Sequence, residues 1–155
     1  MSGFQFEFVE VMPSILNREC RLIGIDPDVG KSGVAIVENG KIFELKNLSF
    51  WDLIDFISEN RSSKIFVEAG WLNKSASHHF AENKFIAAAM GSKVGSNWQT
   101  GKLIVDYCRR MQIEVIEIKP TAKKINAIAF RAVTGWKSRT NQETRDAAML
   151  VFGRN

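Results

Sequence analysis

The segment from Leu22 to Val37 constrains the fold more than any other part of this chain. It reads LIGIDPDVGKSGVAIV, in which an apolar run ends at a single carboxylate, Asp26, and a glycine-rich turn leads into a second apolar run. Asn39-Gly40 follows, and this residue pair strongly favours a tight hairpin. Burying an unpaired carboxylate costs several kcal/mol, so packing alone gives no reason for Asp26 to lie there. The pattern indicates a buried strand that presents Asp26 to a cation or to proton chemistry.

Apolar runs further along the chain predict a mixed α/β fold. The run at 64–68 is nearly all apolar, which is typical of a strand in a sheet covered on both faces. Three antiparallel strands, followed by alternating strands and helices, indicate a five-stranded sheet whose last two strands are parallel and whose two faces carry helices. Ser49 is the expected N-cap of the first helix, and Gly135 the expected end of the third. We expect strands at 21–26, 32–38, 41–48, 64–68 and 114–119, helices at 50–59, 97–111, 121–133 and 140–152, and a polar, partly helical stretch at 70–96.

Length and composition fit one globular domain. The 155 residues are 45% apolar and 25% charged, which is ordinary for such a domain. No apolar run reaches the roughly 18 to 20 residues that span a bilayer, and no signal peptide is visible, so no membrane partner is expected. Cys20 and Cys108 form neither a disulfide framework nor a zinc site, and a cytoplasmic, reducing compartment is the default expectation. We expect residues 1–20 to be an extension or arm, and residues 21–155 to be the domain.

Basic residues gather in the last third of the chain, although the net charge is only +4. Such asymmetry is typical of a face that binds a polyanion such as nucleic acid. An ordinary solvated surface gives the same pattern, and charge alone does not separate the two interpretations. Between residues 119 and 142 no acidic residue accompanies Lys119, Lys123, Lys124, Arg131, Lys137 and Arg139.

Three further carboxylates are placed to join Asp26. Glu68 closes the strand at 64–68 as Asp26 closes the first strand, and parallel neighbours would bring both to the carboxyl edge of the sheet, where open α/β sheets bind ligands. Glu143 and Asp146 are three residues apart in the last helix and therefore share a helix face. Four carboxylates from three distant segments can thus converge.

Each of these residues also has a structural interpretation. Thr140-x-x-Glu143 fits a capping box, Asp146 could pair with Arg139 or Arg145, and Glu68 could be a solvated strand end. The coincidence of all four is harder to explain in that way, because clustered carboxylates repel one another unless cations hold them. Hard divalent ions such as Mg²⁺ and Mn²⁺ select oxygen ligands. The chemistry suited to this set is phosphodiester hydrolysis with two ions about 4 Å apart.

Together these motifs resemble the RuvC-type Holliday junction resolvases of the RNase H-like (retroviral integrase) superfamily. The resemblance covers about residues 21–152, and the segment 141–148 is similar to resolvases of phage-like or divergent bacterial type. It implies an RNase H-like fold and a catalytic, metal-binding set of Asp26, Glu68, Glu143 and Asp146 that holds two Mg²⁺ or Mn²⁺ ions. The matching residues are Gly24-Ile-Asp-Pro27 with 30–34, Val67-Glu68, and Glu143-x-x-Asp146-Ala-Ala148.

The same resemblance implies a homodimer that cuts two opposed strands of a four-way DNA junction, with an interface from helices at about 80–111. Trp71 falls where such resolvases carry an aromatic side chain that stacks at the opened bases, although a partly buried core indole remains an alternative. Lys119, Lys123 and Lys124 occupy the region of basic residues near the scissile phosphate. Lys31 is expected near the DNA path, and the other candidates for DNA contacts are Lys74, Arg131, Trp136, Lys137 and Arg139.

Two features depart from the family pattern. The stretch between Glu68 and the helix near Gln99 is longer than in the bacterial housekeeping enzymes, and the first twenty residues have no counterpart. The resulting expectation is a divalent-metal-dependent endonuclease for branched DNA. Its rivals are an RNase H-like nuclease for RNA–DNA hybrids or structured RNA, and a catalytically silent nucleic-acid-binding module. A sugar-kinase-like nucleotide-binding domain is disfavoured by the short length and the Glu-x-x-Asp helix.

Overall fold

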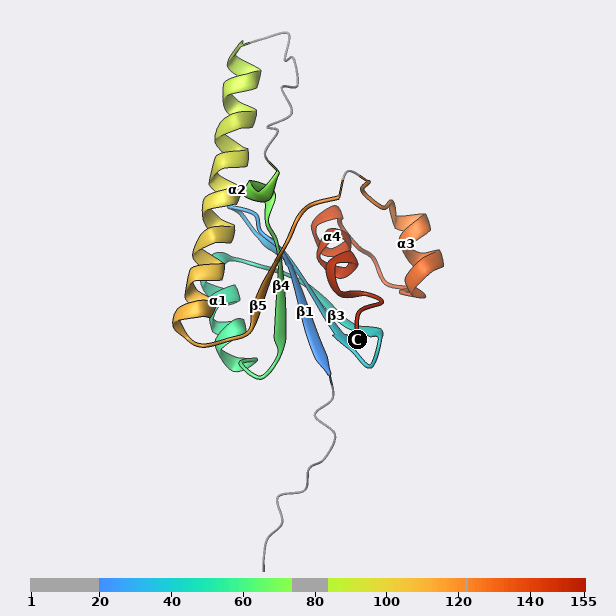
Figure 1. The fold of residues 1–155 in the computed structure, drawn as a ribbon. Helices are drawn as coiled ribbons and strands as arrows, with labels where there is room; N and C mark the ends of the chain where they lie inside the picture. Colours follow the sequence, from blue (N-terminus) through green and yellow to red (C-terminus); the bar gives the residue numbers. More distant parts are fainter. Residues whose placement is uncertain (1–19, 74–83, 122) are drawn as a thin grey trace, which may run out of the picture.

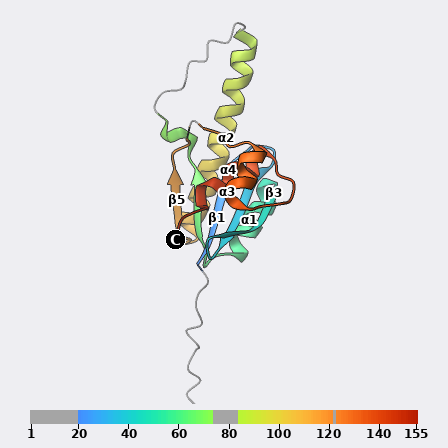
Figure 2. The ribbon, with the colours of Figure 1, turned by 90° about the vertical axis from the view of Figure 1, so that its right-hand side faces the viewer.

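One mixed sheet of five strands forms the centre of the protein, in the order β3-β2-β1-β4-β5. The computed structural model describes residues 20–73, 84–121 and 123–155. β1, β2 and β3 are antiparallel neighbours, and β4 and β5 run parallel to β1, as predicted. β3 lies at one edge and β5 at the other (Figure 2). The strands are β1 (Arg21–Asp26), β2 (Ser32–Glu38), β3 (Lys41–Leu48), β4 (Lys64–Glu68) and β5 (Val115–Ile118).

Helices cover both faces of the sheet, as the sequence predicts (Figure 1). The face under α1 and α2 buries Ile23, Ile25 and Val34 together with Leu53 and Ile104. The face under α3 and α4 buries the alternate strand residues, among them Leu22 and Ala35, which pack with helix residues in a second cluster. The helices are α1 (Phe50–Glu59), α2 (Lys84–Arg110), α3 (Ala127–Thr134) and α4 (Gln142–Val151), with a short 3₁₀ turn, η1 (Gly70–Leu72).

Two glycines bring α4 into direct contact with the strands. A Cβ atom at Gly24 of β1 would overlap the carbonyl oxygen of Ala147, and one at Gly33 of β2 would overlap the carbonyl oxygen of Glu143. No larger residue fits at either position unless the helix moves away from the sheet. This close approach fixes the first two turns of α4 over the ends of β1 and β2.

The structure corrects the expected starts of two helices. The helix expected from Asn97 begins at Lys84, inside the stretch predicted to be partly helical, and it extends beyond the sheet (Figure 1). Residues 88–95 of α2 are exposed, so this part lacks the apolar periodicity that would have revealed it. α3 begins at Ala127 rather than at 121, with the Asn126 side chain accepting a hydrogen bond from the Ala129 N–H at 2.9 Å. Gly135, at φ 73°, ends α3 as expected.

Within the described residues, no helix is both long and apolar enough to span a membrane.

The first helix matches its predicted bounds, and Ser49 caps it by accepting from the Asp52 N–H. Cys108 is buried in the sheet core, whereas Cys20 is exposed at the start of β1, and both thiols are free.

Candidate active site

β1 and β4 end side by side, and each ends in a carboxylate. The parallel register pairs Ile25 with Val67, so that the next residues, Asp26 and Glu68, are neighbours across the two strands. Both side chains are partly buried at the carboxyl edge of the sheet. Buried apolar residues precede each of them, and these residues fix the two carboxylates on a rigid base.

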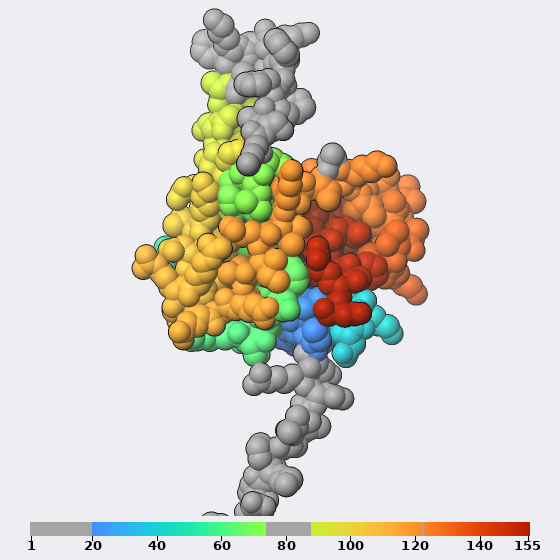
Figure 3. Space-filling view, in the orientation of Figure 1, coloured from blue at the N-terminus to red at the C-terminus, as the bar shows by residue number. Residues whose placement is uncertain are grey.

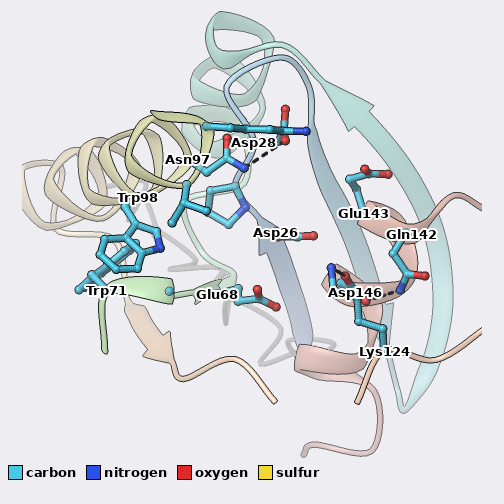
Figure 4. A pocket seen from close by; sticks show the side chains of 14 residues that line it. Asp26, Asp28, Glu68, Trp71, Asn97, Trp98, Lys124, Gln142, Glu143 and Asp146 are labelled. Atoms are coloured by element: carbon cyan, nitrogen blue, oxygen red, sulfur yellow. Dashed lines mark hydrogen bonds and ion pairs between the residues drawn. The ribbon is translucent and has the colours of Figure 1, made fainter. Parts of the chain in front are cut away.

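α4 adds Glu143 and Asp146 to the same cavity. The close contact of this helix with Gly24 and Gly33 places its first turns over the end of β1. A cavity of about 260 Å³ results, with all four carboxylates in its wall. Figure 4 shows Asp26 and Glu68 projecting from the strands toward Glu143 and Asp146 of the helix.

The capping interpretation of Glu143 is wrong. Asn141 is the N-cap of α4, and its side chain accepts a hydrogen bond from the Thr144 N–H at 2.9 Å, while Thr144 Oγ1 accepts from the Asn141 N–H at 3.3 Å. The capping box therefore lies one residue later than the sequence suggested. Glu143 falls in the first turn with its side chain at the cavity instead of at the backbone.

Asp146 is held by Lys124 and Gln142 rather than by an arginine. Lys124 Nζ lies 2.9 Å from Asp146 Oδ2, and Gln142 Nε2 donates to Asp146 Oδ1 at 2.6 Å. Arg145 instead donates to the Ile125 carbonyl oxygen at 3.0 Å, which ties α4 to the segment before α3. Of the three expected lysines, Lys124 reaches the carboxylate cavity.

Lys119 and Lys123 line a neighbouring cavity of about 150 Å³ that shares Glu68, Lys124 and Asp146 with the first. The basic segment after β5 therefore borders the acidic site along one side. In Figure 3 this segment lies against α4 on the surface of the molecule.

Burial and mutual repulsion disfavour the ionised carboxylates. Loss of water, followed by the charges of Glu68 and Asp146, raises the pKa of Asp26 to about 8 from an ordinary 3.8, while Lys124 acts in the opposite direction. The pKa of Glu68 is raised as well, first by burial and then by Asp146. The hydrogen bond to Asp146 raises the pKa of Lys124. With Asp28, five carboxyl side chains line the cavity, and they outnumber its two lysines, Lys93 and Lys124.

The chemistry of the donors fits a hard divalent cation, because the carboxyl groups of Asp26, Glu68, Glu143 and Asp146 all line one cavity. Side-chain placement is a separate matter. Across the ranges 20–73, 84–121 and 123–155, no three His, Cys, Asp or Glu side chains stand close enough to hold one ion together. The fit to a metal rests on the donor set and on the electrostatic imbalance.

Trp71 is a partly buried indole that packs against the core and also lines the cavity. A Cβ atom at Gly101 would lie 2.6 Å from Trp71 Cζ3, so the absence of a side chain at 101 makes room for the ring. Lys102 Nζ lies 6.0 Å from the ring centroid, within cation–π range. The core interpretation of Trp71 describes its packing, and its position at the cavity is compatible with the stacking role.

Sequence reasoning missed the wall of the cavity that α2 supplies. Asn97 Oδ1 accepts from the Val29 N–H at 2.9 Å, and Asn97 Nδ2 donates to Asp28 Oδ2 at 3.2 Å, so the turn after β1 is attached to α2. Trp98 packs over Gly70, where a Cβ atom would overlap its indole nitrogen. Figure 4 places Trp71 and Trp98 together, away from the carboxylates. The small residues at 70 and 101 were the available signals.

The remaining candidates for DNA contacts are dispersed. Lys31 is exposed and does not line the carboxylate cavity. Lys74 lies outside the described residues. The side chains of Arg131, Trp136 and Arg139 line a separate cavity near the start of α4, and Lys137 is exposed beside it.

The order and directions of the strands, with helices on both faces, define an RNase H-like α/β fold. Among solved structures, the chain is similar to RuvC of Thermus thermophilus. One such structure has a TM-score of 0.53 at 13% identity, covering 85% of this chain and 91% of that one. A T. thermophilus RuvC in complex with a Holliday junction substrate has a TM-score of 0.51 at 15% identity, covering 85% and 90%. The sequence matches no protein-family model and no curated protein.

Proposed function

We propose that this protein is a divalent-metal-dependent endonuclease that resolves four-way or otherwise branched DNA by hydrolysing phosphodiester bonds. The observation that carries the proposal is the gathering of Asp26, Glu68, Glu143 and Asp146 in one cavity at the carboxyl edge of an RNase H-like sheet. Similarity of fold to a RuvC bound to a Holliday junction substrate supports this choice of DNA. The 141–148 motif favours the phage-like or divergent bacterial branch.

In this proposal the four carboxylates hold two Mg²⁺ or Mn²⁺ ions. Bound ions of this kind activate water and stabilise the charge of the leaving oxygen. Lys124 and Gln142 fix both oxygens of Asp146, so this carboxylate keeps one orientation. Lys124 also places an ammonium group beside the acidic cluster, where it would meet a phosphate oxygen and reduce repulsion of the DNA strand.

The basic segments on either side of α3 would bind the DNA backbone. Lys119 and Lys123 border the acidic cavity, which suits contact with phosphates next to the scissile one. Trp71 would stack on an opened base, and base–aromatic stacking is typically worth about 1 to 3 kcal/mol. Lys31, Lys74, Arg131, Trp136, Lys137 and Arg139 are the further candidates for backbone contact.

A homodimer would place two such sites on opposed strands of a junction. The long helix α2, which extends beyond the sheet, is the element proposed for that interface. Light scattering is expected to give twice the chain mass in solution. A monomer at all working concentrations would contradict paired incision. We assign the nuclease to residues 21–155; of the extension or arm expected at 1–20, residues 1–19 lie outside the described residues.

The proposal is tested by incubating the protein with a synthetic four-way junction, a linear duplex and an RNA–DNA hybrid in Mg²⁺ or Mn²⁺. We expect symmetric nicking of the junction, with 5′-phosphate and 3′-hydroxyl ends, and none in EDTA. Asp26→Asn and Asp146→Asn should each reduce the rate at least 1,000-fold, on the order of the loss seen when an essential group is removed. Asp106→Asn is the matched control, because Asp106 pairs with Arg110 on the exposed side of α2.

Preference for the RNA–DNA hybrid would instead support the hybrid nuclease. Junction binding without cleavage of any substrate would support the silent binding module. Equal cutting of all three substrates would exclude selectivity for branched DNA.

A further inference from the structure

The partly buried guanidinium of Arg145, in α4, donates hydrogen bonds from each of its nitrogens. Nε donates to the Ile125 carbonyl oxygen at 3.0 Å, and Nη2 donates to Gln142 Oε1 at 2.9 Å. Nη1 donates to Thr140 Oγ1 at 3.0 Å and to the Thr140 carbonyl oxygen at 3.3 Å. Arg145 does not line the carboxylate cavity, so any effect that it has on the cavity passes through one of these partners.

Gln142 links Arg145 to Asp146. Arg145 and Asp146 are consecutive residues of the helix, so their side chains point in different directions. Gln142 lies about one turn before both of them, and its amide contacts both side chains. Oε1 accepts from Arg145, and Nε2 donates to Asp146 Oδ1 at 2.6 Å. Lys124 Nζ lies 2.9 Å from the other oxygen, Asp146 Oδ2, and Figure 4 shows Gln142, Asp146 and Lys124 lying together.

The chemistry of its two neighbours allows one orientation of the Gln142 amide. A guanidinium has donors and no acceptor, so only the amide oxygen can face Arg145. An ionised carboxylate has acceptors and no donor, so only the NH₂ group can face Asp146. Reversing the amide would break both hydrogen bonds. Loss of the guanidinium would remove one of the two restraints that aim the NH₂ group at Asp146.

The same guanidinium anchors the chain next to Lys124. The carbonyl oxygen of Ile125, the following residue, accepts from Arg145 Nε at 3.0 Å and from Gln142 Nε2 at 3.4 Å. Residues 123–126 belong to no helix or strand, so no regular series of backbone hydrogen bonds holds them. The contact with Arg145 therefore fixes the point from which the Lys124 side chain starts. Both groups that hold Asp146 thus depend on one guanidinium.

We propose that Arg145 is a positioning residue of the acidic site, whose guanidinium orients Gln142 and anchors Lys124 so that Asp146 keeps one side-chain orientation. This inference rests on the proposed function, because a carboxylate that is fixed in advance loses less freedom when it binds an ion. Replacement of a residue that orients a metal ligand typically costs about 10- to 100-fold in metal affinity. Arg145 itself touches neither the ion nor the DNA in this proposal.

The first test follows the side-chain amide signals of Gln142 by NMR in EDTA, and Gln142→Ala assigns them by their loss. Arg145→Lys keeps the charge but cannot make the same set of contacts. The Gln142 signals should therefore shift toward those of a solvated amide. Arg61→Lys is the matched control, because Arg61 Nη2 donates to the Met111 carbonyl oxygen at 2.8 Å at the opposite end of the sheet. It should leave the Gln142 signals unchanged.

The second test measures Mn²⁺ binding without DNA, by calorimetric titration. Arg145→Lys should weaken binding about 10- to 100-fold and raise the Mn²⁺ needed for half-maximal junction cleavage by a similar factor. In a Gln142→Ala background the same change should have a smaller effect, because part of the connection is already missing. Thermal unfolding in EDTA establishes that each variant folds. Gln142→Ala alone, which leaves the other contacts of Arg145 in place, should also weaken Mn²⁺ binding and keeps the connection testable if Arg145→Lys does not fold.

Unchanged Gln142 signals in Arg145→Lys would overturn the inference. So would equal losses of Mn²⁺ affinity in Arg145→Lys and Arg61→Lys, or Mn²⁺ affinity in Arg145→Lys equal to that of wild type. If the wild-type protein cuts the junction in any of these cases, the nuclease proposal stands without the role of Arg145. If the Gln142 signals shift as expected but wild type binds no Mn²⁺ and cuts no junction, the nuclease proposal fails and the orientation of Asp146 through Arg145 stands.

Discussion

The charged side chains at the two ends of the sheet differ in how well they are balanced. At the amino end of β1 the charges are matched: Arg21 bonds Glu38 of β2 and donates to Asn60 Oδ1 at 2.9 Å, and Lys64 lies 3.2 Å from Glu114. At the carboxyl end five carboxyl side chains, those of the four site residues and Asp28, line a cavity with two lysines, of which Lys124 pairs with Asp146. The first end contributes stability to the fold. The clustered carboxylates at the second end reduce the stability of the fold, as is usual for the residues of a functional site.

The largest difference between the two ends is expected from two glycine variants. Gly33→Ala should lower the free energy of unfolding by about 3 kcal/mol, because the added Cβ overlaps the Glu143 carbonyl oxygen. Displacement of α4 should also reduce cleavage about 100-fold or more. Denaturant unfolding and the junction assay measure the two effects.

Gly40→Ala is the matched control at the opposite end of the sheet. Gly40 lies in the hairpin at φ 76° with no atom near its missing Cβ, so the expected loss is about 1 kcal/mol from backbone strain alone. Its cleavage rate should remain that of wild type. Equal damage from both variants would show that contact between α4 and the strands does not control the site.

The second prediction concerns the pH dependence of the metal-free protein. The folded-state pKa of Asp26 is raised to about 8 from an unfolded value near 3.8, so the folded protein binds the proton more tightly than the unfolded chain. The stability that this proton provides is complete below about pH 4 and is lost as the pH rises to about 8. Asp26→Asn should therefore stabilise the metal-free protein by about 2 kcal/mol at pH 8 and have little effect at pH 4.

Thermal unfolding in EDTA across this pH range measures the effect. Addition of Mg²⁺ should stabilise wild type at pH 8 and leave Asp26→Asn nearly unchanged, because a bound ion stabilises the state that holds it. If the stability of the metal-free wild-type protein rises between pH 4 and 8, Asp26 does not have a raised pKa in the folded state.

The smallest effect is expected at the amino end and has the opposite sign. Glu38→Gln should destabilise the protein by about 1 kcal/mol, since the partly buried Arg21 loses its charged partner. Urea unfolding at pH 7 gives the comparison with Asp26→Asn. If both neutral variants stabilise the protein, the contrast between the two ends is not real.

The sequence predicted those strands and helices that are specified by residues close together in the chain. β1 to β4 and α1 were correct because buried strands and a capped amphipathic helix leave their signature within ten residues. The convergence of Asp26 with Glu68 followed from the ends of parallel strands. Sequence alone could predict these features without knowledge of any tertiary contact.

The features that depend on contact between distant segments were not predictable. The pairing of Lys124 with Asp146 and the attachment of Asn97 to the turn after β1 each require a partner that the local sequence does not specify. The stretch at 70–96 was predicted to be partly helical, but the start of α2 at Lys84 was not, because residues 88–95 are exposed and have no sheet to pack on. Tertiary context decides such cases.

The direct seat of α4 on β1 and β2 has a consequence for dynamics. Asp146 lies beside the buried residues Ala147 and Ala148 of the same helix, so its backbone amide should exchange with solvent only through global unfolding. Lys124 lies between β5 and α3, outside any helix or strand, and should exchange through small local openings. Asp146 is thus held as firmly as the rest of the fold, whereas Lys124 can move when a phosphate binds.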